Sequence, residues 1–187
     1  MNEVYKIVFM GAPGSGKTTC IAALSDIPPV STDVPCTDAL QETKDTTTVA
    51  LDYGELRLDG DNGRLLLYGL PGQSRFSYMF DVVRAGLFGA IVLVDASSEG
   101  AIDGLAETLE TYREDLASIP LVVAINKSDE PSHALGLRCQ QALHAQGLVA
   151  PVTAMDARRR DDVVQLFEVL LTLLEFGFGH TSKGRAT

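Results

Sequence analysis

VYKIVFMGAPGSGKT, residues 4–18, is the stretch that decides the fold. Residues 4–10 form an apolar run typical of a buried strand, and a helix is expected from about Lys17 to Ser25. Between them lies GAPGSGKT, residues 11–18, which matches the pattern G-x-x-x-x-G-K-[ST] at every fixed position. A strand, a glycine-rich loop and a helix in this order predict a loop that wraps around phosphate groups.

The chemistry of phosphate binding explains these residue types at this spacing. Glycines let backbone N–H groups turn toward phosphate oxygens, and the N-terminus of the following helix adds partial positive charge. Lys17 can reach the β- and γ-phosphates, and the Thr18 hydroxyl can ligate Mg²⁺. The predicted phosphate-binding residues in this loop are Gly11, Gly14, Ser15, Gly16, Lys17, Thr18 and Thr19.

Strand and helix patterns alternate along the rest of the chain. The short apolar runs 90–95 and 121–126 are typical of parallel strands buried on both faces, and DGDNG favours a hairpin between residues 49–58 and 64–69. Further elements are expected as helices at 101–117, 132–146 and 161–176 and a strand at 149–154. The pattern predicts one α/β domain over residues 1–187: a doubly wound, mostly parallel six-stranded sheet with one antiparallel edge strand, helices on both faces and a flexible tail at 180–187.

Composition narrows the classes of function. The formal net charge of -10 argues against binding to nucleic acid or to an anionic lipid surface, because both require a basic protein surface. The 3 cysteines are widely spaced, which favours a reducing compartment over a disulfide framework or a zinc site. No apolar run reaches the roughly 20 residues of a membrane span, and no leader opens the chain, so we expect a cytoplasmic protein without an intrinsic membrane anchor.

NKSD, residues 126–129, follows a buried strand and is expected at the same sheet edge as the phosphate loop. The Asp129 carboxylate can accept two N–H donors of guanine that adenine lacks, and the Lys127 stem can cover the base. Asn126 can brace the neighbouring loops. Ala154, at the end of the next strand, could offer its backbone N–H to the guanine O6, although a plain strand-to-helix loop remains an alternative there. These four residues are the predicted guanine-binding set.

Four motifs, GAPGSGKT, TTTVALDYG, GLPGQ and NKSD, occur in this order, and the chain resembles a Ras-like small GTPase over nearly its whole length. The resemblance implies a P-loop NTPase fold, GTP or GDP and Mg²⁺ as ligands, and a molecular switch that hydrolyses GTP slowly. It assigns Thr48, with the neighbouring Thr46 and Thr47 as alternatives, to Mg²⁺ and the γ-phosphate, in addition to Thr18 as a metal ligand. It also assigns Gly72 to sensing of the γ-phosphate and Gln73 to catalysis, by orienting the attacking water. Lys17, through its contact with the phosphates, is the second predicted catalytic residue.

The sequence departs from most Ras-like proteins at Gly69, where they carry an aspartate that contacts Mg²⁺ through water. The Pro-Gly-Gln turn without that aspartate is similar to the bacterial MglA-type polarity GTPases, which are found beside roadblock-domain proteins. This resemblance implies a roadblock-type or other activating or exchange partner, and an effector, contacting residues 33–48 and 69–84. Lys44 and Arg75 are the cationic candidates to assist hydrolysis, and both are interpreted as surface charges.

Two questions stay open at the level of the sequence. Phe76, Tyr78 and Phe80 suit either a partner-binding surface or packing beneath the loop onto the sheet. The missing carboxylate raises a second hypothesis for the function, a GTP- or GDP-dependent binding module with negligible hydrolysis. A third, a nucleotide kinase, lacks a suitably placed arginine cluster, since the arginines at 158–160 fall far from the expected site.

Overall fold

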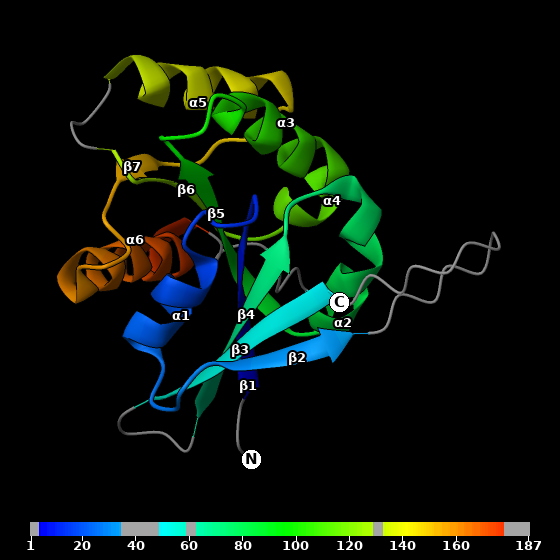
Figure 1. Cartoon of the computed structure of the whole chain (residues 1–187), viewed down its shortest axis with the longest axis vertical. Helices are drawn as coiled ribbons and strands as arrows, with labels where there is room; N and C mark the ends of the chain where they lie inside the picture. Colours follow the sequence, from blue (N-terminus) through cyan, green and yellow to red (C-terminus); the bar gives the residue numbers. More distant parts are fainter. Residues whose placement is uncertain (1–3, 35–48, 59–62, 129–132, 178–187) are drawn as a thin grey trace, which may run out of the picture.

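The computed structural model describes residues 4–34, 49–58, 63–128 and 133–177 (Figure 1). Its elements are β1 (Val4–Gly11), α1 (Lys17–Leu24), β2 (Val30–Val34), β3 (Val49–Arg57), β4 (Arg64–Pro71), the 3₁₀ helix η1 (Ser74–Met79), α2 (Phe80–Arg84), β5 (Leu87–Asp95), α3 (Ala101–Thr111), α4 (Arg113–Leu116), β6 (Leu121–Asn126), α5 (His133–Ala145), β7 (Val152–Ala154) and α6 (Arg160–Gly177). The predicted strands and helices are therefore present, and the α/β class is confirmed.

The described strands form one 7-stranded sheet in the order β2-β3-β4-β1-β5-β6-β7. Only β3 runs antiparallel to its neighbours, β2 and β4, and the other pairs are parallel. The predicted count of six strands is wrong, because β2 pairs along the outer side of β3. Its sequence, VSTDV, is short and largely polar, so it lacks the alternation that marked the other strands.

Helices cover both faces of the sheet, as predicted. Figure 1 shows α1 and α6 together on one face, with α3, α4 and α5 on the other. The alternation of side chains along β1 separates the two cores: Ile7 and Phe9 pack with α1 and α6, whereas Val8 and Met10 pack with the opposite helices. Each face of the sheet is thus sealed from water by its own apolar layer.

The predicted helix 101–117 is divided into α3 and α4, which meet at Tyr112. The apolar last helix, α6, places Val163, Leu166 and Leu170 against the sheet, which explains most of its hydrophobic character. Phe176, near its end, is 80% exposed. Within the described ranges, no helix combines the length and the apolar character needed to cross a bilayer.

The strand order brings the predicted motifs to one edge of the sheet. β1 lies between β4 and β5, with β2, β3 and β4 on one side of it and β5, β6 and β7 on the other. Parallel sheets of this kind bind ligands at the carboxyl ends of the strands, where the order reverses. The loops that follow β1, β4, β5 and β6 begin at this edge, because these strands all run parallel.

Candidate functional site

The loop between β1 and α1 has a backbone that only glycine tolerates at key positions. Gly11 has φ 141, and a Cβ there would lie 2.4 Å from the Leu93 carbonyl oxygen. Gly16 has φ 108, and a Cβ there would lie 2.5 Å from Nδ2 of Asn126. Side chains are thus kept out of the loop, and the backbone can approach a ligand closely.

The start of α1 is suited to an anion. Gly16 is the N-cap residue of α1, and no side chain makes a capping hydrogen bond there. The first turn, all of which the structure describes, contains no acidic residue. The N–H groups of Lys17, Thr18 and Thr19 belong to the first helical turn, where donors have no intrahelical acceptor. The Thr18 and Thr19 side chains are exposed. Backbone donors and the helix dipole at this point match the chemistry of a phosphate group.

The Lys17 side chain folds back onto the phosphate loop. Its Nζ donates hydrogen bonds to the carbonyl oxygens of Gly11, at 3.0 Å, and Ala12, at 2.9 Å. Burial lowers the pKa of Lys17 to about 8, and the negative charge of nearby Asp52 partly opposes that shift. Ser15, beneath the loop, is fully buried, and its hydroxyl has no hydrogen-bond partner among the described residues.

Asn126 joins the phosphate loop to the predicted base-reading loop. Its side chain is buried, and Nδ2 donates to the Ser15 carbonyl oxygen at 2.8 Å. Its Oδ1 accepts a hydrogen bond from the Ala157 N–H at 3.0 Å. The single amide therefore ties together the segments after β1, β6 and β7. The structure places Asn126 as the brace between loops that the sequence suggested.

Lys127 has a left-handed backbone, with φ 60, directly after β6. Its Nζ lies 2.7 Å from Oδ2 of Asp95, at the end of β5. Burial alone would raise the pKa of Asp95, but hydrogen bonds from Lys127 and Ser97 outweigh it and hold the pKa below its usual value. Ala154 ends β7 and is exposed. Asp129, the predicted base reader, lies outside the described residues.

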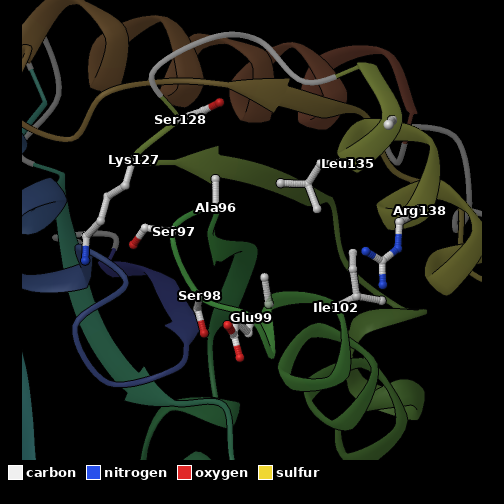
Figure 2. A pocket seen from close by; sticks show the side chains of 11 residues that line it. Ala96, Ser97, Ser98, Glu99, Ile102, Lys127, Ser128, Leu135 and Arg138 are labelled. Atoms are coloured by element: carbon white, nitrogen blue, oxygen red, sulfur yellow. The ribbon is translucent and has the colours of Figure 1, made fainter.

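A cavity of about 480 Å³ adjoins the base-reading loop. It is lined by residues from the segment after β5, from the start of α3, from the loop after β6 and from α5 (Figure 2). Lys127 stands at one side of this cavity, and its amine turns away from Leu135 and Arg138 on the opposite side. The base-reading loop thus has an open space next to the lysine stem.

The end of β4 carries no carboxylate, but its neighbour β3 does. Gly69 pairs across the sheet with Asp52, and the Thr18 hydroxyl donates a hydrogen bond to Oδ2 of Asp52. Asp52 therefore lies beside the residue predicted to bind Mg²⁺. Thr48, the other predicted metal ligand, lies outside the described residues.

Gly72 is buried against the phosphate loop. Its N–H donates to the Gly11 carbonyl oxygen at 3.1 Å. Oγ1 of Thr108, a buried residue of α3, lies 3.2 Å from the Gly72 carbonyl oxygen and 2.8 Å from that of Gly104. The turn after β4 is thus in direct contact with both the phosphate loop and α3.

Gln73 is half-buried, and its Oε1 accepts a hydrogen bond from Arg75 at 3.0 Å. The Arg75 guanidinium also lies over the Phe76 ring, 4.6 Å from its centre. The structure answers the open question about the aromatic residues: Phe76 and Phe80 are buried in the core, whereas Tyr78 is 39% exposed.

Sequence reasoning did not identify three residues of this site: Asp52, Asp95 and Thr108. Asp52 had a partial signal, since it is a charged residue within the otherwise strand-like run 49–58, although the sequence does not show that it reaches Thr18. Asp95 ends a buried apolar strand, which also marks it as a candidate. Thr108 lies within an ordinary helical pattern, and nothing in its surroundings along the chain distinguishes it.

Comparisons with known proteins identify a family for this chain. Residues 32–170 match the family described as conserved hypothetical ATP binding protein, a match that begins after the phosphate loop. An uncharacterized protein of Methanocaldococcus jannaschii is 34% identical over 126 residues, which are 66% of this chain and 70% of that protein. A Ras and EF-hand domain-containing protein of Danio rerio is 26% identical over 157 residues, or 81% of this chain and 22% of that protein.

Translation initiation factor IF-2 of Pelotomaculum thermopropionicum is 28% identical over 149 residues, which are 74% of this chain and 15% of the factor. The chain thus spans less than a quarter of the length of the Danio rerio and Pelotomaculum proteins. The family match covers most of this chain, and the archaeal relative is matched over two thirds of its length. The chain therefore belongs to the family of conserved hypothetical ATP binding proteins, and it is a P-loop nucleotide-binding protein.

Proposed function

We propose that this protein is a guanine-nucleotide-binding molecular switch that hydrolyses GTP to GDP slowly and recruits partners in its GTP state. The observation that carries the proposal is the Asn126 brace. Its amide bonds the phosphate loop on one side and the segment after β7 on the other, so a phosphate site and a base site are held as one unit. The match to a protein named for a Ras domain supports the same class.

Guanine rather than adenine is the base that this proposal assigns, although the family description names ATP. The NKSD motif supports guanine, because a carboxylate at Asp129 would pair with two N–H donors that adenine does not have. The ion pair between Lys127 and Asp95 fixes the lysine stem that would cover the base. Ala154 remains the proposed source of a backbone N–H for the guanine O6.

Mg²⁺ is the metal expected with the nucleotide, and bound there it would neutralise charge on the phosphates. The exposed Thr18 hydroxyl at the start of α1 fits this role, since hydroxyl and carboxylate oxygens are ligands that the ion prefers. Thr48 is the second proposed ligand. The chain's own residues supply the phosphate cradle, with Lys17 turned inward against the loop carbonyls.

The turn after β4 would register the γ-phosphate. In the structure the Gly72 N–H bonds the Gly11 carbonyl oxygen, and the Gln73 amide is held by Arg75. A γ-phosphate would compete for the Gly72 N–H, and Gln73 would have to leave Arg75 to orient water. Both changes would move residues 74–84, so the conformation of η1 and α2 would report the bound nucleotide.

Partners would contact this same segment. Residues 69–84 present Arg75, Tyr78, Val82 and Arg84 at the surface, a mixture of aromatic, aliphatic and guanidinium groups suited to protein interfaces. We propose a roadblock-type or other activating or exchange protein, and an effector, as its partners, and a place for this chain near the MglA-type GTPases. Of the other predicted contact segment, residues 35–48 lie outside the described residues.

Gln73→Leu is expected to slow single-turnover GTP hydrolysis at least tenfold, because leucine cannot orient the attacking water. The native protein should hydrolyse GTP on the order of 10⁻⁴ s⁻¹ without a partner. The measurement is GDP formed from a stoichiometric GTP complex in excess Mg²⁺. Gln165→Leu, the same substitution at an exposed position of α6, is the matched control and should keep the native rate.

Equal hydrolysis by the native protein and Gln73→Leu would remove Gln73 from the chemistry. If both bind GTP and neither hydrolyses it, the alternative function is favoured, a GTP- or GDP-dependent binding module with negligible intrinsic turnover. Gly69, which leaves β4 without a carboxylate, is the observation that motivates this alternative.

A further inference from the structure

Asp52 is a carboxylate close to the end of β4, where Gly69 provides none. It lies on β3, directly across the sheet from Gly69, and its Oδ2 accepts a hydrogen bond from the Thr18 hydroxyl. Its other oxygen, Oδ1, lies 3.2 Å from the Ser31 hydroxyl of β2. The half-buried carboxylate is thus held from two sides, beside the N-terminus of α1.

A side chain at position 69 would overlap with the space that the Asp52 side chain fills. A Cβ built at Gly69 would lie 3.0 Å from the Asp52 Cβ and 3.3 Å from its Oδ2. It would also lie 3.1 Å from Cδ1 of Ile21 on α1. Side chains at paired positions of antiparallel strands point to the same face. A carboxylate on β4 and one on β3 would therefore compete for the same position, and the glycine leaves it to Asp52.

The packing of β3 against α1 explains how Asp52 reaches Thr18. A Cβ at Gly54, two residues further along the strand, would lie 2.6 Å from Cγ2 of Ile21 and 2.8 Å from Oγ of Ser25. This contact is possible only without a side chain at Gly54, and it brings the strand close to the helix. Positions 52 and 54 lie on the same face of β3, so Asp52 is directed at the start of α1.

We propose that Asp52 supplies, from β3, the carboxylate of the Mg²⁺ site that Ras-like proteins place at the end of the strand corresponding to β4. The inference rests on the proposed nucleotide-binding function. Carboxylate oxygens are preferred Mg²⁺ ligands, directly or through bound water. By accepting the hydrogen bond from the Thr18 hydroxyl, Asp52 also leaves the lone pairs of the Thr18 oxygen free for the metal. Asp52 thus serves the metal and orients the neighbouring ligand.

The test measures the release of a fluorescent GDP analogue, with Mg²⁺ present and after its removal by EDTA. In the native protein, EDTA should speed release at least tenfold. In Asp52→Asn this acceleration should fall at least fivefold, while the release rate in EDTA stays within twofold of native. For Asp52→Asn, the Mg²⁺ concentration that slows release of the analogue by half should be at least tenfold higher than for the native protein.

Glu55→Gln is the matched control. It removes the same charge from the same strand, but Glu55 lies on the opposite face, near Tyr53 and Arg64. This variant should keep the native Mg²⁺ dependence. In the double variant Asp52→Gly with Gly69→Asp, the carboxylate moves to the paired strand and its contacts with the Asp52 side chain are removed, which leaves only the flexible end of Ile21 nearby. At least half of the EDTA acceleration should return.

Each outcome separates the two proposals. If the native protein releases the analogue with the expected Mg²⁺ dependence and Asp52→Asn does the same, Asp52 is not part of the metal site and the inference is overturned. The inference also fails if Asp52→Asn changes release equally with and without Mg²⁺, since that marks a purely structural residue. If the native protein does not bind the analogue at all, the proposed function itself fails, and the inference with it.

Discussion

Lys17→Ala is expected to weaken nucleotide binding at least about 100-fold while leaving the protein folded. Hydrogen bonds from a charged amine to phosphate oxygens contribute roughly 1.5–3 kcal/mol each, and tenfold in affinity corresponds to about 1.4 kcal/mol. Lys17 is already turned into the loop, where Nζ holds two carbonyl oxygens. A bound phosphate would therefore meet the amine in place, without a costly rearrangement of the side chain.

The measurement is equilibrium titration of a fluorescent GDP analogue, with circular dichroism to verify the fold of each variant. Lys6→Ala is the matched control, because it removes the same charge from β1, where Nζ of Lys6 lies 3.3 Å from the Val82 carbonyl oxygen. The control should bind like the native protein. An affinity of Lys17→Ala within threefold of native would show that the loop does not bind phosphates as described.

Gly72→Ala is expected to lower the free energy of unfolding by about 1–3 kcal/mol, the usual cost of overpacking a close-packed site. A Cβ at this position would lie 2.2 Å from Oγ1 of Thr108, and 3.3 Å from the backbone of Gly11. Both neighbours are held in place, since Thr108 is buried in α3 and Gly11 belongs to the phosphate loop. Urea unfolding, followed by circular dichroism, measures the effect.

A double-mutant cycle with Thr108→Ala tests the cause. Removal of Oγ1 relieves the contact, so the double variant should be more stable than the sum of the single effects predicts. Gly104→Ala, one turn earlier in α3, is the control: a Cβ there meets nothing within 4 Å, and alanine should raise helix stability slightly. Additive effects of Gly72→Ala and Thr108→Ala would contradict the proposed contact.

Local motifs made the phosphate loop and the parallel strands predictable. The motif GAPGSGKT indicates the backbone conformation of its loop, because Gly11 and Gly16 adopt conformations that other residues avoid. Continuous apolar runs in the sequence indicate strands β5 and β6, because both faces of these strands are buried. In each case the signal lies within the segment that forms the structure.

Features that depend on partners distant in sequence could not be predicted in the same way. Asp52 reaches Thr18 only because β3 pairs beside β4 and packs on α1, 34 residues away along the chain. Phe76 and Phe80 are apolar residues in a loop-like sequence, and only the packing of η1 and α2 against α3 places them inside. β2 depends on its pairing with β3, because its own sequence is too short and polar to indicate a strand.

The proposed function requires that this P-loop protein bind guanine nucleotides in preference to adenine nucleotides. The most direct measurement is displacement of a bound fluorescent GDP analogue by unlabelled GDP and by unlabelled ADP, in excess Mg²⁺. Because only guanine offers the paired N–H donors that the Asp129 carboxylate would bind, GDP should displace the analogue at a concentration at least about 100-fold lower than ADP. Equal displacement by ADP would contradict the assignment of guanine.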